Sequence, residues 1–154
     1  SLVDISVLAA EKVRCFGLQP NIALISFSDF GSDDAESSCE ARRAVALLHE
    51  RYPDLSVDGE MQIQTALQLA QRDAKYPQNK LKGKQVNVLV FPRLSAANAC
   101  YQLLKAVGNA DEVVGPIQVG LARPIYFADH DASVKDIVNI TAMASLDSNA
   151  CIVG

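Results

Sequence analysis

The sequence lacks several patterns that mark specialised proteins. It contains no tryptophan and four cysteines in 154 residues, and no two cysteines form a C-x-x-C pair. The spacing of a common zinc-binding or redox motif is therefore absent. We expect the cysteines to be small apolar side chains in a reducing compartment, the cytoplasm, with no disulfide and no metal site. They are Cys15, Cys39, Cys100 and Cys151.

Charge and apolar runs are limited as well. Lys and Arg number 14 against 18 Asp and Glu, the net charge is -4, and the basic residues are scattered along the chain. Nucleic-acid binding needs a basic stripe, so the sequence disfavours a nucleic-acid partner. No apolar run approaches the ~20 residues of a membrane helix, so we expect no membrane partner.

The residues that are present fit one globular domain. Hydrophobic residues make up 49% of the chain and charged residues 21%, as in ordinary soluble proteins. A chain of this length buries roughly 70% of its unfolded surface. Helical patterns begin and end close to both termini, so we expect a segment of a longer polypeptide.

Apolar runs alternate with helical patterns along the sequence. The runs 21–27 and 86–91 are rich in β-forming residues, as in strands that are covered on both faces. This alternation predicts a three-layer α/β/α domain with a mostly parallel, mixed sheet, whose ligands bind beyond the carboxyl ends of the strands. Shorter strands are expected at 55–57, 112–114, 117–121 and 124–127. Helices are expected over 2–16, 37–52, 60–76, 95–107 and 133–144.

Serines mark the expected starts of three helices. Ser37 and Ser133 stand three residues before an acidic residue, Glu40 and Asp136, which is the capping-box pattern. Ser95 is a simple N-cap candidate. We expect the helix that follows Ser95 to turn an apolar face inward. That face consists of Ala97, Cys100, Tyr101, Leu104 and Val107.

The loop after the first clear strand is rich in hydroxyl groups. Ser26, Ser28, Gly31 and Ser32 follow this strand and precede a helix. Backbone N–H groups and hydroxyls in such a loop can hold a phosphate. The loop matches neither a Walker A nor a dinucleotide motif, so an ordinary strand–helix connection is the alternative.

Three further places carry polar groups that could take part in chemistry. Asp58 and Glu60 could form a general acid/base pair or a metal site, or they could be a turn residue that stops the strand and a first-turn helix residue. Asn98 follows two alanines, which permit close approach of a ligand or tight helix–sheet packing. Asp129-His130-Asp131 could orient an imidazole as a base, or form a polar loop before a helix.

Five segments of the chain resemble the phosphate acetyl/butyryltransferase (phosphotransacetylase) family. They are PNIALISFSDFGS (20–32), VDGEMQIQTAL (57–67), VNVLVFPRLSAANACYQLLK (86–105), VGPIQVGLARPIYF (114–127) and SVKDIVNITAMA (133–144). The resemblance implies an isocitrate/isopropylmalate dehydrogenase-like fold of two subdomains with the active cleft between them. It also implies that 1–154 is a partial domain, with the second subdomain at about 1–121, a return segment at 122–154, and the upstream half absent.

The chain departs from the motif of this family at the catalytic residues. Where the family has Leu-Ser-Arg-Gly-Cys-Ser, this sequence has residues 128–133, Ala-Asp-His-Asp-Ala-Ser, although it keeps Asp136. Asp129 replaces the Ser and His130 the Arg that holds the anionic substrate. A carboxylate repels phosphate, and a neutral His is a poor substitute for a guanidinium. Losing such a clamp lowers the rate about 10²–10³-fold, so the resemblance implies no catalytic residue here.

Other segments are more similar to the C-terminal domain of large bacterial malic enzymes. These are DGEM (58–61), LSAANACYQLLK (94–105) and VNITAMASLDS (138–148). The second segment contains Ala96-Ala97-Asn98, where transferases have Gly before the Asn. This resemblance implies a regulatory and oligomerising domain that senses acetyl-CoA and dimerises. The cofactors NAD(P) and a divalent metal would then belong to the malic domain, which converts malate to pyruvate.

The implied acetyl-CoA or phosphate cleft involves eight residues of this chain. Two alternatives remain open: an active phosphate acyltransferase, and a purely structural dimerisation module. The eight residues are Ser28, Gly31, Ser32, Asn98, Gly120, Asp129, His130 and Asp136.

Overall fold

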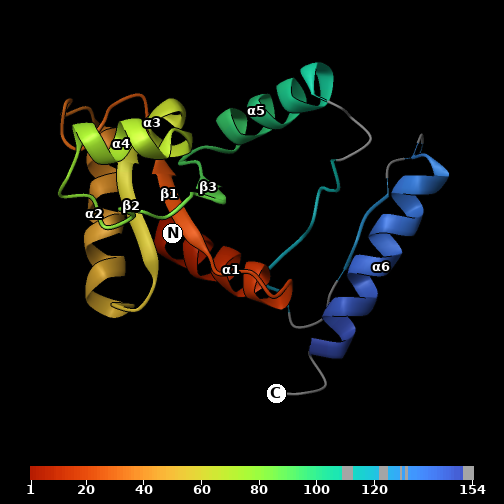
Figure 1. Ribbon diagram of the computed structural model, residues 1–154. Helices are drawn as coiled ribbons and strands as arrows, with labels where there is room; N and C mark the ends of the chain where they lie inside the picture. The colour runs from red at the N-terminus through yellow and green to blue at the C-terminus, as the bar shows by residue number, and fades with distance from the viewer. Residues whose placement is uncertain (109–112, 122–124, 129, 131, 151–154) are drawn as a thin grey trace.

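The computed structural model describes residues 1–108, 113–121, 125–128, 130 and 132–150, with the backbone alone at 148–150. Its centre is a sheet of three parallel strands in the order β2-β1-β3. The strands are β1 (Asn21–Ile25), β2 (Ser56–Met61) and β3 (Val88–Val90). The prediction of an α/β/α domain with a parallel sheet is confirmed, and the described strands include no antiparallel one (Figure 1).

Helices and one loop cover both faces of the sheet. Helices α1 (Leu2–Cys15) and α2 (Glu36–Arg51) pack on the face that Ile22 and Leu24 of β1 present. On the opposite face, Ala23 and Ile25 contact α3 (Ile63–Leu67) and the loop around Leu81. Alternate side chains of β1 enter the apolar layers on the two faces of the sheet. Nearly every residue of the strand is therefore apolar.

Strand β2 continues past the point where the sequence predicts its end. Asp58 and Gly59 do not stop the strand, which runs on to Met61 with a register shift opposite Leu24 and Ile25. Gly59 adopts a φ of 141°, and a Cβ atom there would lie 2.6 Å from the Leu24 carbonyl oxygen. The glycine therefore serves close strand packing, and Glu60 lies in a strand rather than in the first turn of a helix.

The helix predicted over 60–76 is two short helices, α3 and α4 (Leu69–Lys75), separated at Gln68. The side chain of Arg72 is fully buried beside this break. Its Nη1 atom donates to the Ala66 carbonyl, and its Nη2 atom donates to the carbonyls of Leu81 and Lys84. This buried arginine satisfies one carbonyl beside the break and two in the loop before β3, and an apolar repeat does not reveal such a contact.

Two of the three predicted helix starts are wrong. Helix α2 begins at Glu36 with Ala35 as its N-cap, and α5 (Leu94–Val107) begins after Arg93 with no side-chain cap. The third prediction is confirmed. Helix α6 (Val134–Ala150) follows Ser133, whose Oγ accepts from the Asp136 amide at 3.2 Å while its own amide donates to Asp136 Oδ2 at 2.9 Å.

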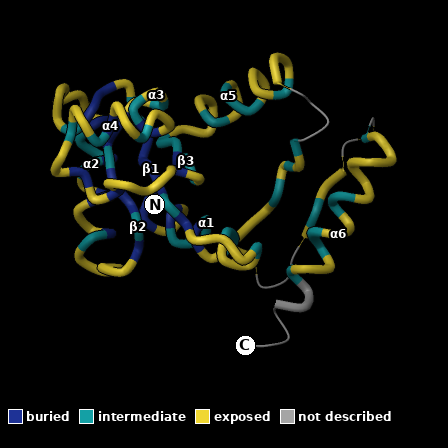
Figure 2. The backbone as a smooth tube through the Cα atoms, viewed as in Figure 1, coloured by how far each residue is buried: buried dark blue, intermediate teal, exposed yellow. Residues whose placement is uncertain are grey.

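The part of the chain after Val90, called the second half below, contributes little to the core where it is described. Every buried residue in the described part of the chain lies between Leu2 and Val90 (Figure 2). None of the 14 residues of α5, all of which are described, is buried. Of the predicted inward face, Ala97, Cys100 and Tyr101 are half-buried, whereas Leu104 and Val107 are exposed, so that end of the prediction is wrong. The strands predicted between 112 and 127 reduce, where described, to one antiparallel bridge between Ile117 and Tyr126, and positions 112 and 124 lie outside the described residues.

No helix in the described part of the chain is both long and apolar enough to cross a membrane.

Replacing Gly59 with alanine should destabilise the fold by about 3 kcal/mol or more, because the new methyl group meets backbone and the φ angle is strained. Gly83→Ala is the matched control, since Gly83 also has a positive φ, of 72°, but nothing within 4 Å of its added Cβ. We expect it to cost ~1 kcal/mol. Chemical unfolding of the full-length protein measures both losses, and equal losses would contradict the close-packing role of Gly59.

Candidate functional site

The hydroxyl-rich loop after β1 donates hydrogen bonds to a buried carboxylate, that of Glu60. Glu60, from β2, has no exposed surface, and its Oε1 atom is the common acceptor of the loop. Oε1 lies 2.9 Å from Ser28 Oγ and 2.9 Å from the Gly31 amide nitrogen. Its other oxygen, Oε2, has no hydrogen-bond partner among the described residues. The groups that could hold a phosphate therefore already face a carboxylate of the protein itself.

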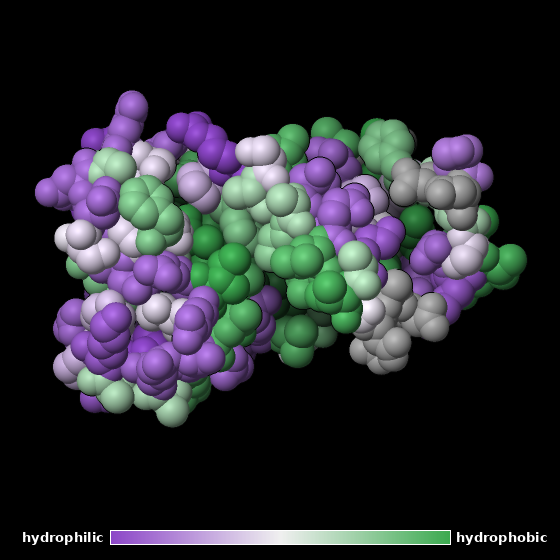
Figure 3. Space-filling view, turned by 90° about the horizontal axis from the view of Figure 1, so that it is seen from above, coloured by the Kyte–Doolittle hydropathy of each residue, from purple (hydrophilic) through white to green (hydrophobic). Residues whose placement is uncertain are grey.

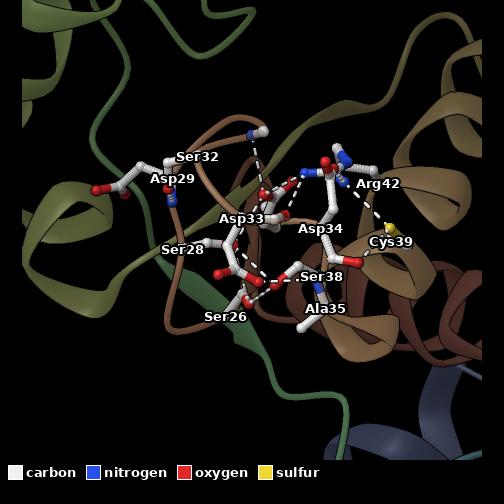
Figure 4. A network of polar contacts seen from close by, with 12 residues as sticks. Ser26, Ser28, Asp29, Ser32, Asp33, Asp34, Ala35, Ser38, Cys39 and Arg42 are labelled. Atoms are coloured by element: carbon white, nitrogen blue, oxygen red, sulfur yellow. Dashed lines mark hydrogen bonds and ion pairs between the residues drawn. The ribbon is translucent and has the colours of Figure 1, made fainter.

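Serine side chains connect this loop to the start of α2. Ser28 Oγ lies 2.8 Å from Ser38 Oγ, and Ser26 Oγ lies 3.1 Å from the same atom (Figure 4). Ser32 is exposed, and its Oγ accepts from the Asp29 amide at 3.0 Å. Of the predicted loop residues, Ser28 and Gly31 thus contact Glu60, whereas Ser32 closes a turn.

Arg42 provides the positive charge beside the loop. Its Nη1 atom lies 3.0 Å from Glu60 Oε1, and its Nη2 atom lies 2.8 Å from Asp34 Oδ1 and 3.1 Å from Cys39 Sγ (Figure 4). Burial lowers the pKa of Arg42, but Glu60, Cys39 and Asp34 together outweigh it and the pKa is raised. The sequence pattern does not reveal this role, because Arg42 looks like any charged residue on the polar face of a helix.

The loop carries more negative than positive charge. Asp34 and Glu60 share a single arginine, Arg42, whose two terminal nitrogens both already contact carboxylates, and the loop carries two further carboxylates, Asp29 and Asp33. A phosphate would meet net repulsion there, and the available donors are engaged. The geometry is better suited to an uncharged, hydrogen-bonding part of a ligand than to a phosphate group.

Asp58 and Glu60 do not act on a common partner. Asp58 Oδ1 accepts from the Gly59 amide at 2.9 Å, and Oδ2 accepts from the Lys80 amide at 2.5 Å. Asp58 therefore anchors the loop before β3, while Glu60 anchors the loop after β1. The described residues contain no group of three or more His, Cys, Asp and Glu placed to hold a metal ion.

A polar pocket of about 160 Å³ lies beyond the carboxyl ends of β1 and β2. Asp29 reaches it from the loop after β1, and its Oδ1 atom accepts from the Gln62 amide at 2.9 Å. Ligands of parallel sheets bind at this edge, so its place agrees with the expectation from the sequence. The residues around the pocket are Asp29, Gln62, Gln64, Thr65, Gln71, Arg72, Lys75 and Tyr76.

The remaining predicted site residues lie in the second half of the chain. Asn98 is exposed on α5, and His130 is exposed in a turn. Hydrogen bonds from the side chain and backbone of Ser133 lower the pKa of Asp136, which caps α6. Gly120 packs on α1, where an added Cβ would lie 3.0 Å from Leu8 Cδ1. Asp129, like Asp131, lies outside the described residues.

The chain does not bring all predicted residues into one site. The amino-terminal end of α6 lies far from the carboxyl ends of the strands, on the other side of the molecule (Figure 1). Ser28, Gly31 and Ser32 therefore belong to one group, and His130 and Asp136 to another. A ligand that touched both groups would have to span the space between the sheet and α6.

A family model described as phosphate acetyl/butaryl transferase matches residues 1–145. The chain belongs to the phosphate acetyl/butaryl transferase family. The family resemblance of its sequence segments is thereby confirmed.

This chain is similar both to malic enzymes and to phosphate acetyltransferases. The chain is 42% identical over 147 residues to the NADP-dependent malic enzyme of Escherichia coli strain K12, covering 96% of this chain and 19% of that protein. It is 41% identical over 151 residues to the phosphate acetyltransferase of Treponema pallidum, covering 96% of this chain and 44% of that protein. The chain thus spans about a fifth of the malic enzymes and under half of the acetyltransferases.

Solved structures of the phosphate acetyl/butaryl transferase family share this fold. The EutD phosphotransacetylase from Staphylococcus aureus matches 94% of this chain with a TM-score of 0.85 at 30% identity, over 44% of its own length. A phosphotransacetylase from Streptococcus pyogenes matches 99% of this chain with a TM-score of 0.85 at 31% identity, over 45% of its own length. These matches include the second half of the chain, so its position beside the sheet is also found in longer proteins.

Replacing Glu60 with glutamine should lower the free energy of unfolding by about 2 kcal/mol, because Arg42 and the loop donors lose a buried charged acceptor. Glu40→Gln is the control, since Glu40 forms an exposed ion pair with Arg93 at 3.6 Å. We expect a loss below ~0.5 kcal/mol there. Chemical unfolding monitored by circular dichroism measures both. A loss for Glu60→Gln no larger than that of the control would contradict the anchoring role.

Proposed function

We propose that this chain is a catalytically degenerate, phosphotransacetylase-like domain that binds acetyl-CoA and regulates a malic enzyme of which it forms part. The observation that carries the proposal is the pair Asp129-His130, which stands where the family motif has Ser-Arg. The similarity to malic enzymes, in which the chain covers 19% of the protein, supports the same parent.

The physical reason is the loss of a clamp for phosphate. A guanidinium binds a phosphoryl group through two parallel charge-assisted hydrogen bonds, and a neutral imidazole offers one donor at most. A carboxylate at position 129 adds repulsion. In the loop after β1, the amide of Gly31 and the hydroxyl of Ser28 face Glu60, which supports the same conclusion. A domain without such a clamp can hold acetyl-CoA and leave its thioester intact.

The two groups of predicted residues suggest how acetyl-CoA would be held. Ser28, Gly31 and Ser32 would contribute one wall of the site, and His130 and Asp136 the other, with Asn98 and Gly120 between them. The upstream half of the domain, which the relatives' greater length implies, would complete this cleft. NAD(P) and a divalent metal would act in the malic part of the parent protein, which we place in the cytoplasm.

Helix α5 supports a role in assembly. Its apolar side chains are open to solvent, with Leu94 exposed by 85% and Val107 by 74%. Apolar side chains gather over the middle of the molecule, where α5 lies in Figure 1 (Figure 3). Apolar surface of this kind is usually covered in an assembly. We propose that α5 packs against a second copy of the domain in a homodimer.

The second candidate function is an active phosphate acyltransferase, which the 41% identity to a phosphate acetyltransferase favours. The two candidates differ in chemistry rather than in binding, because both bind acetyl-CoA. They are separated by whether CoA and acetyl phosphate interconvert on the protein.

Calorimetric titration of the full-length protein with acetyl-CoA tests the sensor. We expect saturable binding in the micromolar-to-millimolar range of cellular metabolites, together with a change in malate turnover at the same concentrations. Free CoA is the control ligand and should bind more weakly. If acetyl-CoA neither bound nor changed malate turnover, the proposed sensing function would be contradicted.

The dimer has its own test in the full-length protein. Leu104→Asp places a charge on the exposed apolar face of α5, and light scattering should then report a smaller particle than for the unchanged protein. Gln102→Asp adds the same charge on the same helix at a polar position, and should leave the mass unchanged. Equal masses for all three proteins would contradict an α5 interface.

A further inference from the structure

Helix α6 contacts the rest of the fold at helix α1. All buried described residues lie in 1–91, and α6 reaches this part by contacting α1. The segment before α6 touches α1 as well, at Gly120 and Leu8. The position of α6 relative to the sheet therefore depends on a small contact region rather than on a shared core.

A cluster of three polar side chains lies in this contact region. Lys12, in the last turn of α1, has its Nζ atom 2.8 Å from the Tyr126 hydroxyl. Asp147 of α6 accepts through one oxygen, Oδ2, from both Lys12 Nζ and the Tyr126 hydroxyl. The cluster thus joins α1, the segment before α6 and α6 itself. We call Lys12, Tyr126 and Asp147 the latch.

The latch is shielded from water. The side chains of Lys12 and Asp147 are each 14% exposed, and Lys12 Nζ also lies 5.4 Å from the centre of the Tyr126 ring and 5.5 Å from that of Phe16. Shielding makes the pair stronger than a surface ion pair, and it makes the loss of either partner costly, because the other charge is left without a counter-charge.

The charges of the latch support one another. Burial lowers the pKa of Lys12, but hydrogen bonds to Asp147 and Tyr126 outweigh it and the pKa is raised. Burial raises the pKa of Asp147, but hydrogen bonds from Lys12 and Tyr126 outweigh it and the pKa is lowered. Both groups therefore remain charged across the neutral range.

The latch holds one end of α6, so a change of helix tilt at the latch displaces the opposite end. Asp147 lies near the carboxyl end of the helix, while Asp136 caps the amino-terminal end. A separation of about 11 residues corresponds to ~16 Å along the axis, so a tilt of roughly 10° at the latch would move the cap by about 3 Å. Displacements of this size change ligand contacts, because a hydrogen bond tolerates only a few tenths of an ångström.

We propose that Lys12, Tyr126 and Asp147 are positioning residues that fix the tilt of α6 against the sheet and so set the distance between the two walls of the acetyl-CoA site. The residues would act without touching the ligand, because none of them belongs to either wall. The effect on ligand affinity rests on the proposed function, whereas the effect on α6 does not.

Hydrogen exchange of the full-length protein without ligand tests the latch itself. Tyr126→Phe removes only the hydroxyl, and Lys12→Met removes the charge while keeping most of the volume. We expect amide exchange in α6 to rise about tenfold or more in each variant. Tyr101→Phe is the control, because the Tyr101 hydroxyl donates to the Gly115 carbonyl at 3.2 Å, outside the latch. Unchanged exchange in both latch variants would overturn the proposal.

Acetyl-CoA affinity of the same proteins tests the positioning role. Lys12→Met and Asp147→Asn should each weaken binding about tenfold. The exchanged pair Lys12→Glu with Asp147→Lys should recover most of it, because the tyrosine hydroxyl can donate to one partner and accept from the other. A merely structural contact predicts increased exchange with unchanged affinity, and that result would overturn the positioning role. Failure of the unchanged protein to bind acetyl-CoA would count against the proposed function and leave the exchange result standing.

Discussion

The buried carboxylate of Glu60 is the interaction on which the candidate site depends. It joins the end of β2 to the loop after β1 and to Arg42 of α2, and it does so through one oxygen atom with three partners. Because its charge lies beneath the loop, it orders hydroxyl and amide groups that would otherwise be free for an anion. The same contact therefore stabilises the loop and reduces its affinity for phosphate.

This arrangement agrees with the replacement of Ser-Arg by Asp129-His130 in the second half of the chain. Both features add negative charge or remove positive charge where a phosphoryl group would need the opposite. A family scaffold with these changes is expected to retain contacts to the uncharged parts of acetyl-CoA. Binding without turnover is what the proposed sensing function requires.

Local patterns in the sequence predicted what local forces determine. The Ser133–Asp136 cap and the α1 helix depend on neighbouring residues, and both were predicted correctly. The two apolar strands pair over a long distance in the sequence, but each was predicted from its own apolar run. The Ser37–Glu40 pattern failed because α2 already begins at Glu36, so Ser37 lies inside its first turn. Glu60 was misplaced because its partners are distant in sequence, and Arg42 was missed for the same reason. The apolar residues of α5 predicted a covered face, but the described part of the chain leaves Leu94, Leu104 and Val107 exposed.

The central claim is that the domain binds acetyl-CoA without transferring its acetyl group. Phosphorus NMR of the full-length protein, incubated with acetyl-CoA and inorganic phosphate at saturating concentrations, tests it most directly. We expect the acetyl-CoA and phosphate signals to persist unchanged over hours while the protein remains in its ligand-bound state. The appearance of acetyl phosphate at a rate proportional to protein concentration would contradict the account.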